Sequence, residues 1–123
     1  MAAIKRFDDL DCWKAGKDLY IKLRQFISGS PIEKEFYLKD QLLRAGLSVS
    51  NNIAEGYERG GDKEFRRYLI ISNGSASEVQ SMLLILEEVY PDLKTQDLKD
   101  LLTLAQKCLN LNKGLIRYLN SKG

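Results

Sequence analysis

The stretch that decides the fold is DKEFRRYLIISNGSASEVQSMLLILEEVY, residues 62–90. Its apolar and small residues recur in alternating steps of four and three, which is the spacing of a helix that packs along one side against other helices. The series runs through Phe65, Leu69, Ser72, Ala76, Val79, Leu83, Leu86 and Tyr90. It is sustained for more than three heptads and therefore predicts one long helix with a continuous core-facing side.

The same helical periodicity appears in three further segments, residues 8–27, 34–58 and 95–121. The breaks between segments contain both prolines and fall at residues 28–31, 59–62 and 90–92. Connections this short make consecutive helices antiparallel neighbours. Asp62 and Thr95 are the predicted N-caps of the third and fourth helices, because their side-chain oxygens can accept from first-turn amides. We predict an all-α, antiparallel up-down-up-down four-helix bundle, with residues 1–123 as a single domain.

Composition narrows the class of protein. The chain has 123 residues, of which 44% are hydrophobic, with 19 Lys plus Arg against 17 Asp plus Glu. A chain without histidine lacks the usual general base and the commonest metal ligand. We therefore expect a soluble, non-enzymatic domain with no catalytic residues, metal or cofactor. We also expect no signal peptide and no membrane span, which is consistent with the cytoplasm.

The two cysteines, Cys12 and Cys108, lie far apart in the chain and do not have the spacing of a metal site. Both fall on predicted apolar helix faces, which favours small buried side chains. A disulfide and a reactive thiol are the alternatives.

Polar and small residues interrupt the middle of the second and third helices, in NNIAEG at residues 51–56 and SNGSASE at residues 72–78. Small residues let two backbones approach closely, so that polar groups can bond across the gap. We predict a polar network that fixes the register of the two helices, with Asn52, Glu55, Ser75 and Glu78 as its members. An active site around Glu55 and Glu78 is the alternative, but a di-iron bundle needs Glu-x-x-His motifs and this chain has no histidine.

The first and fourth helices carry apolar faces wider than one bundle contact needs. Wide faces favour self-association, and a tight monomeric core is the alternative. The charge is also uneven, since residues 31–91 hold 7 basic and 10 acidic residues while both ends of the chain are net positive. The candidate phosphate contacts are Arg44, Arg59, Lys63, Arg66 and Arg67. Their alternative role is a solvated face with ion pairs within each helix.

Several short motifs resemble a known family. They are FDDL at residues 7–10, QLLRA at 41–45, NIAEG at 52–56, and GS at 74–75 followed by Glu78. In sequence and spacing they are similar to the four-helix-bundle proteins encoded within 23S ribosomal RNA intervening sequences. Many members have a second arginine where this chain has Leu43.

The resemblance implies a bacterial cytoplasmic bundle assembled as a homopentamer, related to the nucleic-acid-binding accessory protein of diversity-generating retroelements. It supplies no catalytic residues. We accordingly predict a non-enzymatic oligomeric bundle that binds structured RNA or other nucleic acid, RNA or DNA, through basic surface residues. The alternative is a protein-interaction scaffold with a protein partner and no nucleic-acid role.

Overall fold

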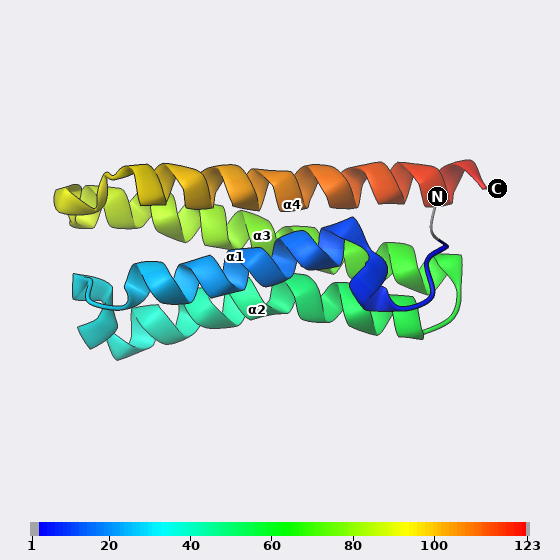
Figure 1. Ribbon diagram of the computed structural model, residues 1–123, viewed down its shortest axis with the longest axis horizontal. Coiled ribbons are helices and arrows are strands. Elements are labelled where there is room, and N and C mark those ends of the chain that lie inside the picture. Colours follow the sequence, from blue (N-terminus) through cyan, green and yellow to red (C-terminus); the bar gives the residue numbers. More distant parts are fainter. Residues whose placement is uncertain (1–2, 123) are drawn as a thin grey trace.

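Four long helices lie side by side along the length of the computed structural model, which describes residues 3–122 (Figure 1). They are α1 (Asp11–Ile27), α2 (Phe36–Glu58), α3 (Asp62–Val89) and α4 (Gln96–Ser121). Short 3₁₀ turns precede α1, α2 and α4, at Phe7–Asp9, Pro31–Lys34 and Pro91–Leu93. Consecutive helices run in opposite directions, and residues 3–122 contain no strand. The predicted all-α four-helix bundle is confirmed.

The helix boundaries agree with the predicted segments to within about three residues, and the differences have local causes. The first helix starts at Asp11 instead of residue 8, because Phe7–Asp9 form a 3₁₀ turn and Leu10 is extended. Thr95 caps α4 as predicted, accepting from the Leu98 amide at 3.4 Å. The N-cap prediction for Asp62 is wrong. Gly61 is the N-cap and Asp62 is the first helical residue, where its negative charge still suits the positive end of the helix dipole.

The core contains the heptad series that the sequence predicts. In α3, all of its members from Phe65 to Leu86 are buried, and the final member, Tyr90, is half-buried. Matching buried residues come from the other helices, among them Leu19 and Leu23 of α1, Leu42 and Ile53 of α2, and Leu98 and Leu101 of α4. The four helices thus enclose one continuous apolar interior.

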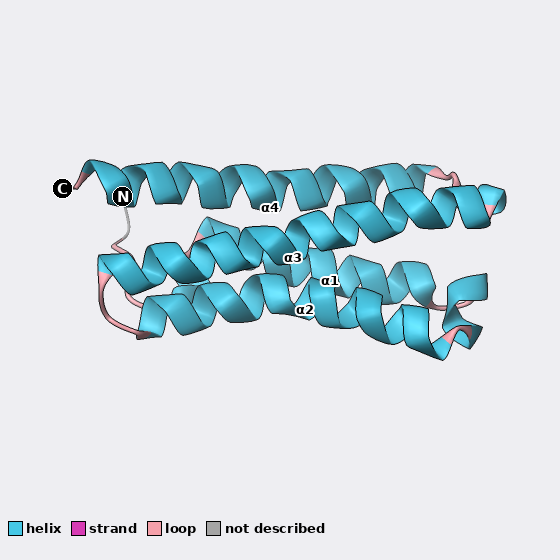
Figure 2. Ribbon diagram, turned by 180° about the vertical axis from the view of Figure 1, so that it is seen from behind, coloured by secondary structure: helices cyan, strands magenta, loops and turns pink. Residues whose placement is uncertain are grey.

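Glycine allows α2 and α3 to come close together, and the two helices lie side by side in Figure 2. A Cβ atom added to Gly56 would lie 2.5 Å from the Cβ of Tyr68 and 3.3 Å from Cδ1 of Phe65. Cβ contacts that short do not occur in folded proteins, so only glycine fits this position at this helix separation. Gly56 thus fixes how near the polar middles of α2 and α3 can lie.

Among residues 3–122, α3 exposes more large apolar residues than any other helix, whereas α1 and α4, for which we expected wide apolar faces, expose only Ile21 and Tyr118. Their extra apolar residues, such as Phe26 and Leu104, are partly buried against the core. The exposed large apolar residues of α3 are Ile70, Ile71, Leu84, Ile85 and Val89, each 41% to 59% exposed. We expected no segment that could span a membrane, but α3 is long and apolar enough to do so by length and composition alone. In the bundle, one side of α3 is buried in the core.

Both cysteines are free and buried. Burial raises the pKa of the Cys12 thiol to about 11 and that of the Cys108 thiol to about 12. At neutral pH both side chains are therefore protonated, and they act as small core residues.

Candidate nucleic-acid interface

A polar network joins the middles of α2 and α3, and it includes two of the four predicted residues. The Asn52 amide Nδ2 donates to the Ser48 carbonyl at 2.8 Å and to Ser48 Oγ at 2.7 Å. From α3, Ser75 Oγ donates to the same Ser48 Oγ at 2.9 Å. Ser48, which the sequence prediction left out, is therefore the centre of the network.

Glu55 and Glu78 lie outside this network, so their predicted membership is wrong. Glu55 lies three residues after Asn52, a rotation of about 60° around α2 that moves its carboxylate into solvent. There its Oε1 accepts from Arg59 Nη2 at 2.8 Å, and the Glu55 side chain is 53% exposed. Glu78 is also exposed and lines a surface hollow between α2 and α3. Leaving both carboxylates in water avoids the cost of burying charge.

Single alanine replacements test whether Glu55 and Glu78 lie outside the polar network. We expect Glu55→Ala and Glu78→Ala each to change the free energy of unfolding by less than about 0.5 kcal/mol, because both side chains are solvated. Urea denaturation followed by circular dichroism gives the value. A loss above about 1 kcal/mol for either variant would mean that the carboxylate has a buried partner after all.

A second network, with Ser72 and Asn112 fully buried, connects α2, α3 and α4. Ser72 Oγ donates to the Val49 carbonyl at 2.8 Å. From α4, Asn112 Nδ2 donates to Ser72 Oγ at 3.0 Å and to Asn73 Oδ1 at 2.9 Å. Asn112 Oδ1 is buried with no hydrogen-bond partner in the described residues. An asparagine at a core position of the α4 heptads was the signal that could have indicated this network.

Three of the five predicted basic residues form ion pairs with carboxylates of their own helices. Arg59 pairs with Glu55, Arg44 with Asp40 at 3.1 Å, and Arg67 with Glu64 at 3.4 Å. The hydrogen bond from Glu55 raises the pKa of the Arg59 guanidinium above its ordinary value. At these three residues the structure has the ion-paired helix face that we gave as the alternative.

Lys63 and Arg66 have no carboxylate within 4.0 Å among residues 3–122. Arg66 Nη1 donates to the Leu119 carbonyl of α4 at 3.3 Å. Together with the bond from Asn112 to Asn73, this contact places the last turns of α4 beside the first turns of α3. The basic end of α3 therefore continues onto α4.

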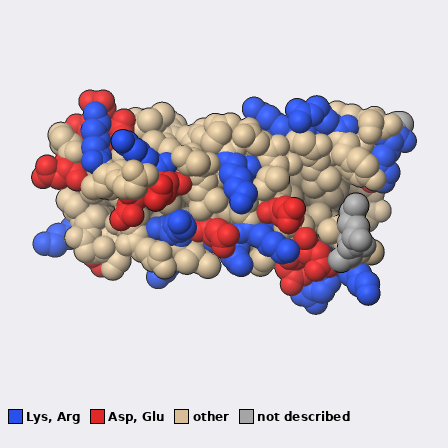
Figure 3. All heavy atoms as spheres, turned by 45° about the horizontal axis from the view of Figure 1, so that its top comes forward, with Lys and Arg blue, Asp and Glu red and all other residues tan. Residues whose placement is uncertain are grey.

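The adjoining part of α4 is basic as well, which the sequence prediction missed. Residues 101–122 contain Lys107, Lys113, Arg117 and Lys122 and no acidic residue. Lys113 and Arg117 are exposed, lie one turn apart, and have no carboxylate partner in the described residues. Lys and Arg side chains gather over this half of α4 in Figure 3. We call Lys63, Arg66, Lys113 and Arg117 the α3–α4 basic face.

Within residues 3–122, no three side chains of the metal-ligating types His, Cys, Asp and Glu come together. The candidate site is therefore an exposed charged surface formed by two helices.

The family model for the 23S rRNA-intervening sequence protein matches residues 8–115. The chain belongs to this family. None of the curated proteins compared with it matches.

A solved relative supports the fold of this 23S rRNA-intervening sequence protein. It is a crystal structure of a protein with unknown function from the S23 ribosomal protein family of Bacteroides thetaiotaomicron. It superimposes with a TM-score of 0.75 at 19% sequence identity, over 85% of this chain and 97% of that chain. At this identity the likeness establishes the shared four-helix bundle alone.

Proposed function

We propose that this 23S rRNA-intervening sequence protein is a non-enzymatic, self-associating bundle in the bacterial cytoplasm that binds structured RNA through its phosphates. The observation that carries the proposal is the α3–α4 basic face, four cationic side chains without a carboxylate partner. Free cations on one surface suit phosphate, because each contact releases counterions condensed on the nucleic acid.

Self-association strengthens the binding of RNA by this surface. One copy offers few cations and a net charge of only +2, so a single face binds weakly. Copies that present the same face together bind one long RNA at several points and gain avidity without new contacts. The exposed apolar residues of α3 support self-association, and the family resemblance implies five copies. Light scattering gives the number, since each chain has a mass of 14.0 kDa.

The double variant Lys113→Ala/Arg117→Ala tests the RNA interface. We expect it to weaken binding to a structured RNA hairpin about tenfold or more, and to reduce the salt dependence of binding, similarly for hairpins of different sequence. Fluorescence anisotropy with a labelled hairpin measures both effects.

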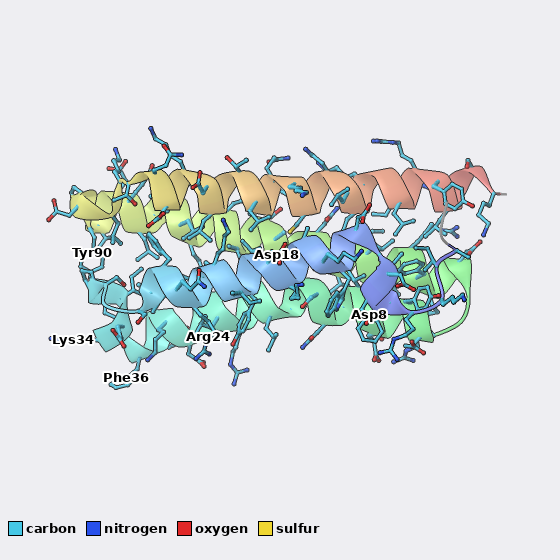
Figure 4. The ribbon with its side chains drawn as sticks, in the orientation of Figure 1. Asp8, Asp18, Arg24, Lys34, Phe36 and Tyr90 are labelled. Carbon is cyan, nitrogen blue, oxygen red and sulfur yellow. The ribbon has the colours of Figure 1, made fainter. Side chains whose placement is uncertain are left out.

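The matched control is Lys34→Ala/Lys94→Ala, which removes the same net charge from exposed positions. Lys34 lies at the opposite end of the bundle (Figure 4), and Lys94 follows the Pro91–Leu93 turn before α4 begins. We expect that control to bind nearly as well as the native chain. Equal losses in the two double variants would contradict a localised interface and leave only a general effect of net charge.

A protein-interaction scaffold is the second candidate function. The observation that favours it is the exposed apolar side of α3, which a protein partner could cover as well as a second copy. Three results together would support this second function: the chain stays monomeric, it binds no RNA at low salt, and it retains a protein partner in a pull-down.

A further inference from the structure

A regular stripe of exposed residues runs along α3 on the side opposite the core. The residues recur in alternating steps of three and four, the same spacing as the buried series on the other side of this helix. This α3 outer stripe consists of Arg67, Ile70, Gly74, Ser77, Ser81, Leu84 and Glu88. Helix geometry alone gives this spacing on any side of a helix, but this side also exposes the large apolar residues Ile70, Ile71, Leu84 and Ile85, each 41% to 59% exposed. Apolar surface of this kind indicates a contact that one copy of the chain does not fill.

The stripe is graded along its length. Its middle has only small residues, and a Cβ atom added to Gly74 would meet nothing within 4 Å. Apolar pairs flank the middle, Ile70 with Ile71 on one side and Leu84 with Ile85 on the other. The stripe begins with the basic Arg67 and ends with the acidic Glu88. A small middle permits close approach of another helix, and the apolar flanks provide area to bury.

This gradation is symmetric about one point, between Ser77 and Glu78. Two antiparallel copies of α3 centred there would oppose opposite charges at the ends, apolar residues next to them and small residues near the middle, with Ser77 facing Glu78 at the centre. The opposed residues are Arg67 and Glu88, Ile70 and Ile85, Ile71 and Leu84, and Gly74 and Ser81, each from a different copy. Because the two copies are equivalent, every pair occurs twice in the contact.

We propose that the α3 outer stripe is a self-recognition surface, on which α3 of a second copy packs antiparallel about this two-fold point. The occupant is a second copy because the stripe is complementary to itself in size, apolarity and charge. Arg67 can pair with Glu88 of the second copy, because its contact with Glu64 in its own chain is long, 3.4 Å, and exposed.

This inference rests on the proposed self-association and specifies one contact of it. A contact between two equal surfaces joins copies in pairs, whereas a ring of five is closed by a contact between two different surfaces. Where such a ring forms, the α3 outer stripe joins one ring to another.

Disulfide cross-linking tests the register directly. The double variant Gly74→Cys/Ser81→Cys places each new thiol opposite its complement on the second copy, so mild oxidation is expected to give a covalent dimer. The single variants are the controls. In the antiparallel register two copies of residue 74 lie about 10 Å apart along the axis, too far for a disulfide. In a parallel contact the single variants would cross-link instead. The native chain controls for Cys12 and Cys108, which are buried.

Charge reversal tests the ends of the stripe without cysteines. Arg67→Glu and Glu88→Arg are each expected to weaken self-association about tenfold, because like charges then face each other twice per contact. The double variant Arg67→Glu/Glu88→Arg is expected to regain the native affinity. The two residues are about 32 Å apart within one helix, so this rescue cannot arise within one copy.

The outcomes separate the two proposals. Light scattering on the native chain that gives a monomer at 100 µM overturns both the self-association and this inference. If the native chain is an oligomer but Gly74→Cys/Ser81→Cys gives no covalent dimer, or charge reversal is not rescued, the self-association stands and the antiparallel α3 contact is overturned. A covalent dimer together with charge rescue supports it.

Discussion

Asn112→Asp is expected to lower the free energy of unfolding by about 3 kcal/mol or more at pH 7. The side chain is fully buried between α3 and α4, where Nδ2 donates to Ser72 and Asn73. An aspartate has no donor for those two oxygens and brings a negative charge to a site that contains no cation. Guanidinium denaturation followed by circular dichroism at 222 nm measures the loss.

Asn112→Leu is the matched control, since it has a similar volume and no polar group. Ser72 keeps its bond to the Val49 carbonyl, and the unpartnered Asn112 Oδ1 disappears. We expect the free energy of unfolding to stay within about 1 kcal/mol of the native value or to rise. If Asp and Leu were tolerated equally well, Asn112 would have to be in contact with water, and the buried network would not exist as described.

Gly56→Ala is the second change with a large expected effect, a loss of about 1–3 kcal/mol in the free energy of unfolding. The added methyl group would lie 2.5 Å from Tyr68 Cβ, an atom next to the α3 backbone that can move only with the helix. α2 and α3 would have to separate, and the bond from Ser75 of α3 to Ser48 of α2 would lengthen. The loss is expected although alanine favours a helix over glycine by about 1 kcal/mol.

Gly114→Ala makes the same chemical change inside α4, where the added atom meets nothing within 4 Å. We expect this control to raise the free energy of unfolding by up to about 1 kcal/mol. Thermal or urea denaturation of the two variants side by side gives the comparison. A gain for both would show that α2 and α3 have room for a larger residue at position 56.

Heptad spacing was sufficient to predict the fold, because one core-facing side per helix and three short connections leave few arrangements. The polar middle of α2 and α3 was predicted as a region but not residue by residue. Membership depends on helix rotation, which turns Asn52 toward Ser48 and leaves Glu55 beside Arg59. The sequence also could not show which wide apolar faces would be covered inside the bundle.

The α3–α4 basic face was predicted only in part, because it unites residues about 50 positions apart in the chain. Lys63 and Arg66 were among the candidates, whereas Lys113 and Arg117 join them only through the antiparallel pairing of α3 and α4. Arg44 and Arg59 are basic in the sequence but form short ion pairs in the structure, which lowers their availability for phosphate. Arg67 has only a long contact with Glu64, at 3.4 Å.

RNA binding by the native chain is the central claim, and a titration at two salt concentrations tests it most directly. A fluorescently labelled, structured RNA hairpin is titrated with the protein at about 50 mM and about 200 mM salt, and anisotropy reports the bound fraction. We predict micromolar or tighter binding at the lower salt and clearly weaker binding at the higher salt, since phosphate contacts release counterions. Absence of binding at the lower salt, or an affinity that does not change with salt, would contradict the account and favour the protein-interaction scaffold.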